Sequence, residues 1–81
     1  MTREKWKVIE RKLGRERAFG QAHSDGLIEL DPRQSSKEYL DTAIHEGLHL
    51  LAPDWTERQV AVGARKLSSL LWALGFRRVR K

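Results

Sequence analysis

The sequence predicts an α+β domain in which a short antiparallel β-sheet of about three strands precedes two packed α-helices. Short runs of residues that favour strands surround the pair Asp25-Gly26, which is typical of hairpin turns. Further along, apolar residues recur at helical spacing in two segments, and each segment begins with a capping pattern. We therefore expect one domain over residues 1–81, mainly β over 1–31, with helices over 35–52 and 56–75 and a basic tail over 76–81.

The N-terminal segment, residues 6–13, fits two descriptions. Trp6, Ile9 and Leu13 fall at helical spacing, whereas Trp, Val and Ile favour strands and Gly14 ends the segment early. We expect a strand here. The strand after the hairpin turn covers residues 27–30 and ends before Pro32, because proline cannot donate a hydrogen bond to a sheet.

The first helix begins after Ser35, which forms a capping-box pattern with Glu38. Its histidines, His45 and His49, lie on nearly the opposite side from its apolar face. That face consists of Leu40, Ala43, Ile44, Gly47, Leu48 and Leu51. Histidines that belonged to the core would lie within the apolar face, so these two form a polar stripe of their own.

The second helix follows a break at Pro53 and begins at Thr56, which forms a capping-box pattern with Gln59. Gly75 suits the position just beyond its end. Glu57 heads a stripe of small residues that would allow the two helices to approach closely, and a carboxylate in such a place needs a partner.

The stretch His45-Glu46-Gly47-Leu48-His49 is the candidate functional site. Two histidines four positions apart lie one helical turn from each other, so both imidazoles can bind one ion. Glu46 follows the first histidine directly and can remove a proton from a water molecule on that ion. The stretch matches H-E-x-x-H, the pattern of zinc hydrolases. His45 and His49 are therefore candidate zinc ligands, and Glu46 is the candidate general base.

A zinc hydrolase usually supplies three protein ligands and leaves the fourth position to water. Glu57, Asp54 and His23 are the candidates for the third ligand. Glu57 is preferred, because a chain that reverses at Pro53 would return it to the histidines. Asp54 lies in the turn and could instead stabilise the start of the second helix. His23 precedes the hairpin turn and could line the edge of a cleft, where it would stabilise an oxyanion, or lie on the surface.

The motif from His45 to His49, followed by Glu57, resembles that of the zincin metallopeptidases. The order of strands, motif helix and further helix is similar to the small SprT-like and ImmA-type bacterial and phage zincin domains. The resemblance implies Zn²⁺ as the cofactor, with His45 and His49 as ligands, Glu46 as the catalytic glutamate and, as in the branch that uses a glutamate, Glu57 as the third ligand. It also implies hydrolysis of an extended peptide or protein substrate, which would bind by adding a strand to a sheet edge.

The charge balance supports a second hypothesis. The chain has 16 Lys and Arg against 11 Asp and Glu, a net charge of +5 at pH 7, and its C-terminus carries the basic cluster Arg77, Arg78, Arg80 and Lys81. Such a cluster can contact nucleic acid, or it can be a solubilising tail. The alternative to a peptidase is therefore a small basic nucleic-acid-binding or interaction module in which any metal serves only the fold.

The composition limits what else stabilises so short a chain. Without cysteine there are no disulfides and no thiolate zinc sites, so a metal held by histidine and carboxylate would add the stability that small domains often need. No apolar run reaches the roughly 18 residues needed to span a bilayer, and the basic N-terminus has no apolar signal core behind it. We expect a cytoplasmic protein without membrane contact.

Overall fold

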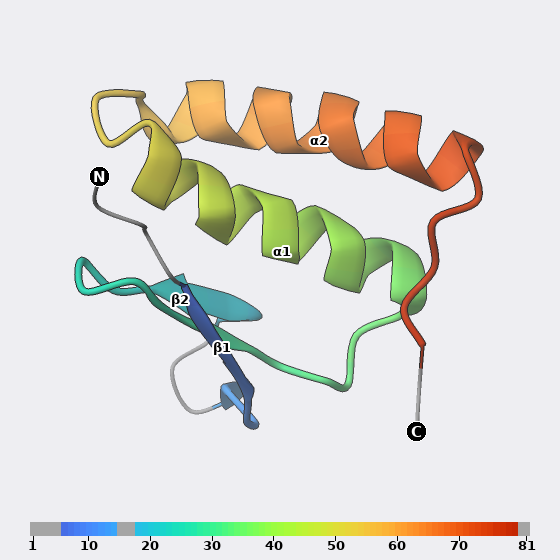
Figure 1. The fold of residues 1–81 in the computed structure, drawn as a ribbon, viewed down its shortest axis with the longest axis horizontal. Helices are drawn as coiled ribbons and strands as arrows, with labels where there is room; N and C mark the ends of the chain where they lie inside the picture. The colour runs from blue at the N-terminus through green and yellow to red at the C-terminus, as the bar shows by residue number, and fades with distance from the viewer. Residues whose placement is uncertain (1–5, 15–17, 80–81) are drawn as a thin grey trace, which may run out of the picture.

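The computed structural model describes residues 6–14 and 18–79 and stacks its elements in three layers (Figure 1). A sheet forms the first layer, helix α1 lies across it, and helix α2 lies on the far side of α1. The elements in chain order are β1 (Lys7–Glu10), β2 (Gly20–Ala22), β3 (Leu27–Leu30), α1 (Ser36–Leu51) and α2 (Glu57–Ala73). The middle layer, α1, is the helix that carries the histidine motif.

The predicted α+β class, three strands followed by two packed helices, is confirmed, but the sheet is mixed. Strand β3 lies between the other two, pairing antiparallel with β2 and parallel with β1. The expectation of an antiparallel sheet is wrong for the pairing of β1 with β3. The chain reverses direction after β1 and again after β2, so β1 and β3 run the same way. Strand β3 inserts between β1 and β2, so the parallel strands β1 and β3 become neighbours.

The first strand and the hairpin form where the sequence indicated them. Residues 7–10 are a strand and not a helix, and Lys7 pairs with Leu27 at the start of the parallel ladder. The β2–β3 turn closes through Gly26, which has a φ of 94° and donates its N–H to the His23 carbonyl at 2.9 Å. Asp25 supports the turn by accepting a hydrogen bond from the N–H of Leu27 at 3.1 Å.

Both helices begin at the predicted caps. The Ser35 and Thr56 side chains each accept a hydrogen bond from the backbone N–H three residues on, and Glu38 and Gln59 complete the two capping boxes. Beyond the last turn of α2, the N–H of Gly75 donates to the carbonyl of Trp72 at 3.0 Å. The sequence thus defines both helices through local hydrogen bonds that satisfy their free backbone groups.

The hydrophobic core lies on both sides of α1. Ile28 and Leu30 of β3 are buried in the sheet, while Val60 and Ala64 of α2 are fully buried. Leu13, which follows β1 in the chain, is also fully buried and donates its backbone N–H to the Asp31 carboxylate. Within the described residues, neither helix is both long and apolar enough to cross a membrane.

Asp31 connects the end of the sheet to the segment before α1. The residue is 2% exposed, and its carboxylate accepts hydrogen bonds from Leu13 N at 2.9 Å and from Arg33 Nη2 at 2.7 Å. The Arg33 guanidinium, followed by the backbone N–H groups of Leu13 and Arg33, holds the pKa of the Asp31 carboxyl well below its usual range. The folded chain therefore binds this proton more weakly than the unfolded chain does.

We predict that acid destabilises the protein in part through Asp31. Because its folded pKa is lowered, its contribution to the free energy of unfolding is present above the unfolded pKa of about 3.9 and is lost as pH falls below it. Urea unfolding between about pH 6 and pH 3 should show a shallower pH slope for Asp31→Asn than for the wild type. Asp25→Asn, at the hairpin turn, is the matched control and should leave the slope unchanged. Equal slopes for wild type and Asp31→Asn would refute the assignment.

Candidate metal centre

The two histidines of the motif lie side by side on α1. His45 and His49 are one turn apart, and their ring centroids are 5.0 Å from each other at an interplanar angle of 64°. Their side chains are 26% and 33% exposed, so both rings are partly buried and partly open to solvent. Rings placed in this way can direct one nitrogen each towards a common point.

A tight connection returns the chain to these histidines. The turn after α1 is closed by a hydrogen bond from Trp55 N to the Ala52 carbonyl at 3.0 Å, and Thr56 then caps α2. The Trp55 ring packs against Gly63, where an added Cβ would be 3.2 Å from the ring and 3.3 Å from Leu48. This packing fixes the start of α2 against the last turns of α1; the two helix ends meet at the left of Figure 1.

Glu57, the first residue of α2, meets both imidazoles. Its Oε1 lies 2.7 Å from His45 Nε2 and its Oε2 lies 3.0 Å from His49 Nε2. One atom from each residue lies within 4.8 Å of the other two, so these three residues could hold a metal ion. The carboxylate directed at the histidines nevertheless remains 68% exposed, because it sits at the open end of the helix pair and not inside the helix interface.

Glu46 projects from α1 towards the edge strand β2. A Cβ added at Gly20 would lie 3.0 Å from Glu46 Cγ and 3.2 Å from its Oε2, which places this carboxylate directly beside the strand. Burial raises the pKa of the Glu46 carboxyl, and the neighbouring His45 and His49 oppose that rise. Glu46 is therefore a partly buried carboxylate next to the two imidazoles and outside the three-residue group.

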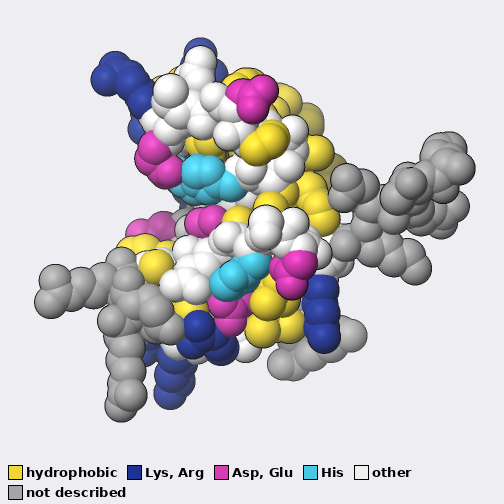
Figure 2. Space-filling model, turned by 90° about the vertical axis from the view of Figure 1, so that its left-hand side faces the viewer, with side chains coloured by type: hydrophobic (Ala, Val, Ile, Leu, Met, Phe, Trp, Pro, Cys, Tyr) yellow, Lys and Arg dark blue, Asp and Glu magenta, His cyan; other side chains and the backbone are white. Residues whose placement is uncertain are grey.

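Two hollows border Glu46 between the helix and the sheet. The larger, about 550 Å³, lies between residues 21–24 on one side and Glu46, His49 and Leu50 on the other. A smaller one, about 200 Å³, is lined by Phe19 and Gly20 and, from α1, by Asp41, Thr42, His45 and Glu46. Seen from this end of the molecule, histidine side chains lie on both the helical and the sheet halves, with carboxylates near them (Figure 2). The site is thus open to solvent along β2.

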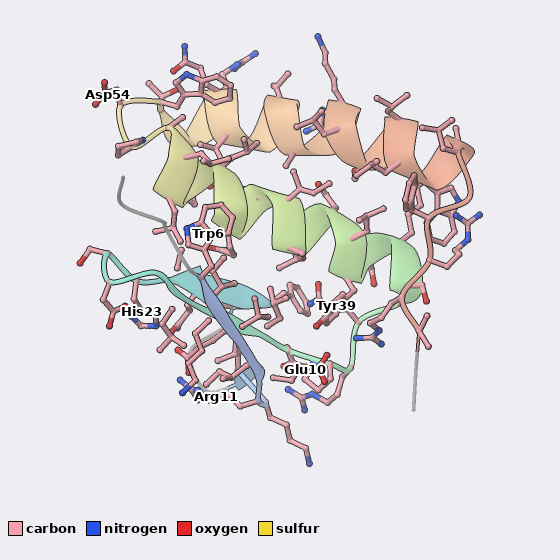
Figure 3. The ribbon with its side chains drawn as sticks, viewed as in Figure 1. Trp6, Glu10, Arg11, His23, Tyr39 and Asp54 are labelled. Carbon is pink, nitrogen blue, oxygen red and sulfur yellow. The ribbon has the colours of Figure 1, made fainter. Side chains whose placement is uncertain are left out.

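The other two candidates for a third ligand lie elsewhere. His23 has its Nε2 at 2.8 Å from Glu29 Oε1, and Glu29 also bonds Arg11, so this ring is engaged by the sheet although His23 lines the rim of the larger hollow. Asp54 is exposed in the turn between the helices and points away from them (Figure 3). Neither joins His45 and His49 in the group.

Part of the basic C-terminus is held against the domain. Arg78 lies over the Tyr39 ring at 3.9 Å, and the Tyr39 hydroxyl donates to Glu10 at 2.5 Å (Figure 3). Arg77 stacks on Trp72 at 3.5 Å. The other two members of the predicted basic cluster, Arg80 and Lys81, lie outside the described residues.

Comparison of the chain with protein-family models, with curated proteins and with solved structures found no match. What the structure itself shows is a group, His45, His49 and Glu57, that could hold a metal ion.

We predict that Gly20→Ala disturbs the contact between β2 and α1. An added Cβ would lie 2.6 Å from Thr42 Cγ2, so the Thr42 side chain or the backbone that carries it must shift. We expect a loss of about 1–3 kcal/mol in the free energy of unfolding, measured by chemical denaturation. Adding Thr42→Ser should restore part of this loss, because serine lacks the methyl group but keeps the hydroxyl that donates to Gln34 at 2.6 Å. A Gly20→Ala variant as stable as the wild type would contradict the close approach.

Proposed function

We propose that this chain is a zinc-dependent hydrolase domain that cleaves peptide bonds. The convergence of His45, His49 and Glu57 carries the proposal, because residues from two helices bring three donor atoms within 4.8 Å of one another. Two imidazoles and a carboxylate suit Zn²⁺ among the first-row metals. Glu46, which follows His45 in the chain and is separate from the three proposed ligands, is the glutamate of the H-E-x-x-H motif.

The present contacts of the group are consistent with a cation site. One Glu57 oxygen lies 2.7 Å from His45 Nε2 and the other lies 3.0 Å from His49 Nε2, so a cation bound between them would meet a carboxylate and two ring nitrogens. When bound, zinc would polarise a substrate carbonyl and lower the pKa of a coordinated water molecule to about 7. Since Glu57 is 68% exposed, the group remains accessible from solvent on that side.

In the proposed reaction Glu46 moves the proton. Its carboxylate lines both hollows, sharing the larger with His49 and the smaller with His45. In the proposed reaction a Glu46 oxygen accepts the proton of the attacking water and then donates it to the leaving amine. Burial raises the pKa of Glu46, and this suits both steps. A carboxylate with a raised pKa is a stronger base towards water, and once protonated it keeps the proton until the leaving amine can take it.

The edge strand β2 offers a place for the substrate backbone. No described strand pairs with its outer side, since the sheet order is β1-β3-β2. Asp31 N donates to the Phe19 carbonyl and His23 N donates to the Leu27 carbonyl, each at 2.8 Å. The alternation of an antiparallel ladder then directs the backbone groups of Gly20 and Ala22 outward. An extended peptide bonded to them would run beside Glu46.

We predict that the metal-free protein binds one zinc ion per chain and gains stability. With free zinc at about 100 times the Kd, the gain is about 2.7 kcal/mol, which for a domain of this size raises the Tm by roughly 10–20 °C. Loss of a residue that only hydrogen-bonds a metal ligand weakens binding by roughly 10–100-fold. Glu57→Gln should weaken zinc binding by more than that, because it changes a proposed ligand itself. Isothermal titration and thermal unfolding would measure both effects.

Asp54→Asn is the control for this experiment, because it removes a nearby carboxylate that does not reach the group. It should bind zinc as the wild type does. Zinc binding that survives Glu57→Gln but fails in Asp54→Asn would show that the third ligand is wrong. An absence of zinc binding by the wild type would remove the proposed function altogether.

We predict that Glu46→Gln abolishes hydrolysis without removing zinc. Loss of general acid–base assistance should reduce the rate by about 100-fold or more, measured as fragment release from an unfolded protein such as casein by the zinc-loaded domain. The amide has nearly the same shape as the carboxylate, so zinc affinity should change little. Equal cleavage by both proteins would exclude Glu46 as the base. Cleavage by neither would leave a metal that serves only the fold.

A further inference from the structure

One carboxylate beside the proposed metal centre has an unpaired oxygen. Asp41 Oδ1, on α1, is buried and has no hydrogen-bond partner in the described part of the chain. Buried polar atoms in folded proteins nearly always have a partner, and an unpaired one destabilises the fold. No donor among the described residues is directed at this oxygen.

His45 shares a hollow with Asp41. Asp41 precedes it by one turn, and both residues line the smaller hollow. Helical side chains lean towards the N-terminus, so the His45 imidazole covers the turn that contains Asp41. In the present structure His45 Nε2 faces Glu57 at 2.7 Å, which leaves Nδ1 as the ring nitrogen not turned to the ligand group.

We propose that Asp41 is a positioning residue that accepts the Nδ1–H of His45 when the metal is bound at Nε2. The inference rests on the metal centre proposed above. A metal-binding histidine commonly donates its second ring nitrogen to a carboxylate, which fixes the tautomer and the orientation of the ring. Asp41 Oδ1 is sheltered from solvent, so it would exchange no strong bond to water for this contact.

Zinc affinity and the stability of the metal-free protein together test this role. A competition titration against a chromophoric chelator should show zinc binding weaker by about 10–100-fold in Asp41→Ala. The Tm of the metal-free variant should equal or exceed that of the wild type, because the truncation removes an unpaired buried oxygen. A merely structural aspartate would give the reverse pattern, with a lowered metal-free Tm and unchanged affinity. Asp54→Ala, with the same loss of charge near the site, should retain wild-type affinity.

An NMR measurement gives a second readout, which observes the Nδ1–H of His45 directly and involves neither Tm nor affinity. In the zinc-loaded, ¹⁵N-labelled wild type, His45 should show a slowly exchanging Nδ1–H that is absent from Asp41→Ala and retained in Asp41→Asn, whose side-chain oxygen still accepts a hydrogen bond. A wild type that binds zinc without a protected His45 Nδ1–H, or an Asp41→Ala variant of unchanged affinity, overturns this inference and leaves the proposed function standing. A wild type that binds no zinc overturns both.

Discussion

The return of α2 over the end of α1 is the constraint on which the candidate site depends. His45 and His49 belong to α1, whereas the carboxylate that meets both of their Nε2 atoms, that of Glu57, comes from α2. The short turn, the Thr56 cap and the packing of Trp55 on Gly63 place Glu57 there. Glu57 is also the first residue of α2, where a negative charge is favourable next to the free N–H groups of the helix. The residue that would hold a metal is thus also one that suits the start of its helix.

The position of α1 in the middle layer explains how the site stays open. One side of this helix packs on the sheet and another on α2 (Figure 1), and a strip of its surface that includes the partly exposed His45 and His49 rings stays open. His45 and His49 lie along this strip, and Asp41 precedes them by one turn. Glu46 turns from the strip towards β2, so the carboxylate that would move a proton and the strand that would bind a peptide adjoin each other.

The features that the sequence predicted are those set by nearby residues. Capping boxes, the Asp25-Gly26 turn and the one-turn spacing of the histidines each involve residues within a few positions of one another. The parallel pairing of β1 with β3 was missed because it depends on where a strand inserts after two reversals, which the local pattern of residues does not encode. The engagement of His23 by Glu29 likewise follows from sheet register. Asp41 could have been noticed by its spacing of one turn from His45, but its unpaired oxygen is visible only in three dimensions.

The brevity of β2 has a kinetic consequence. Gly20 and Ala22 direct two N–H and two C=O groups outward, and such bonds contribute roughly 0.5–1.5 kcal/mol each. Their sum of roughly 2–6 kcal/mol does not clearly exceed the roughly 4–15 kcal/mol that association costs in lost motion. Backbone pairing would therefore align a passing chain without retaining it. In the proposed peptidase reaction, cleaved fragments held only by these bonds would leave the strand quickly, so their departure would not limit turnover.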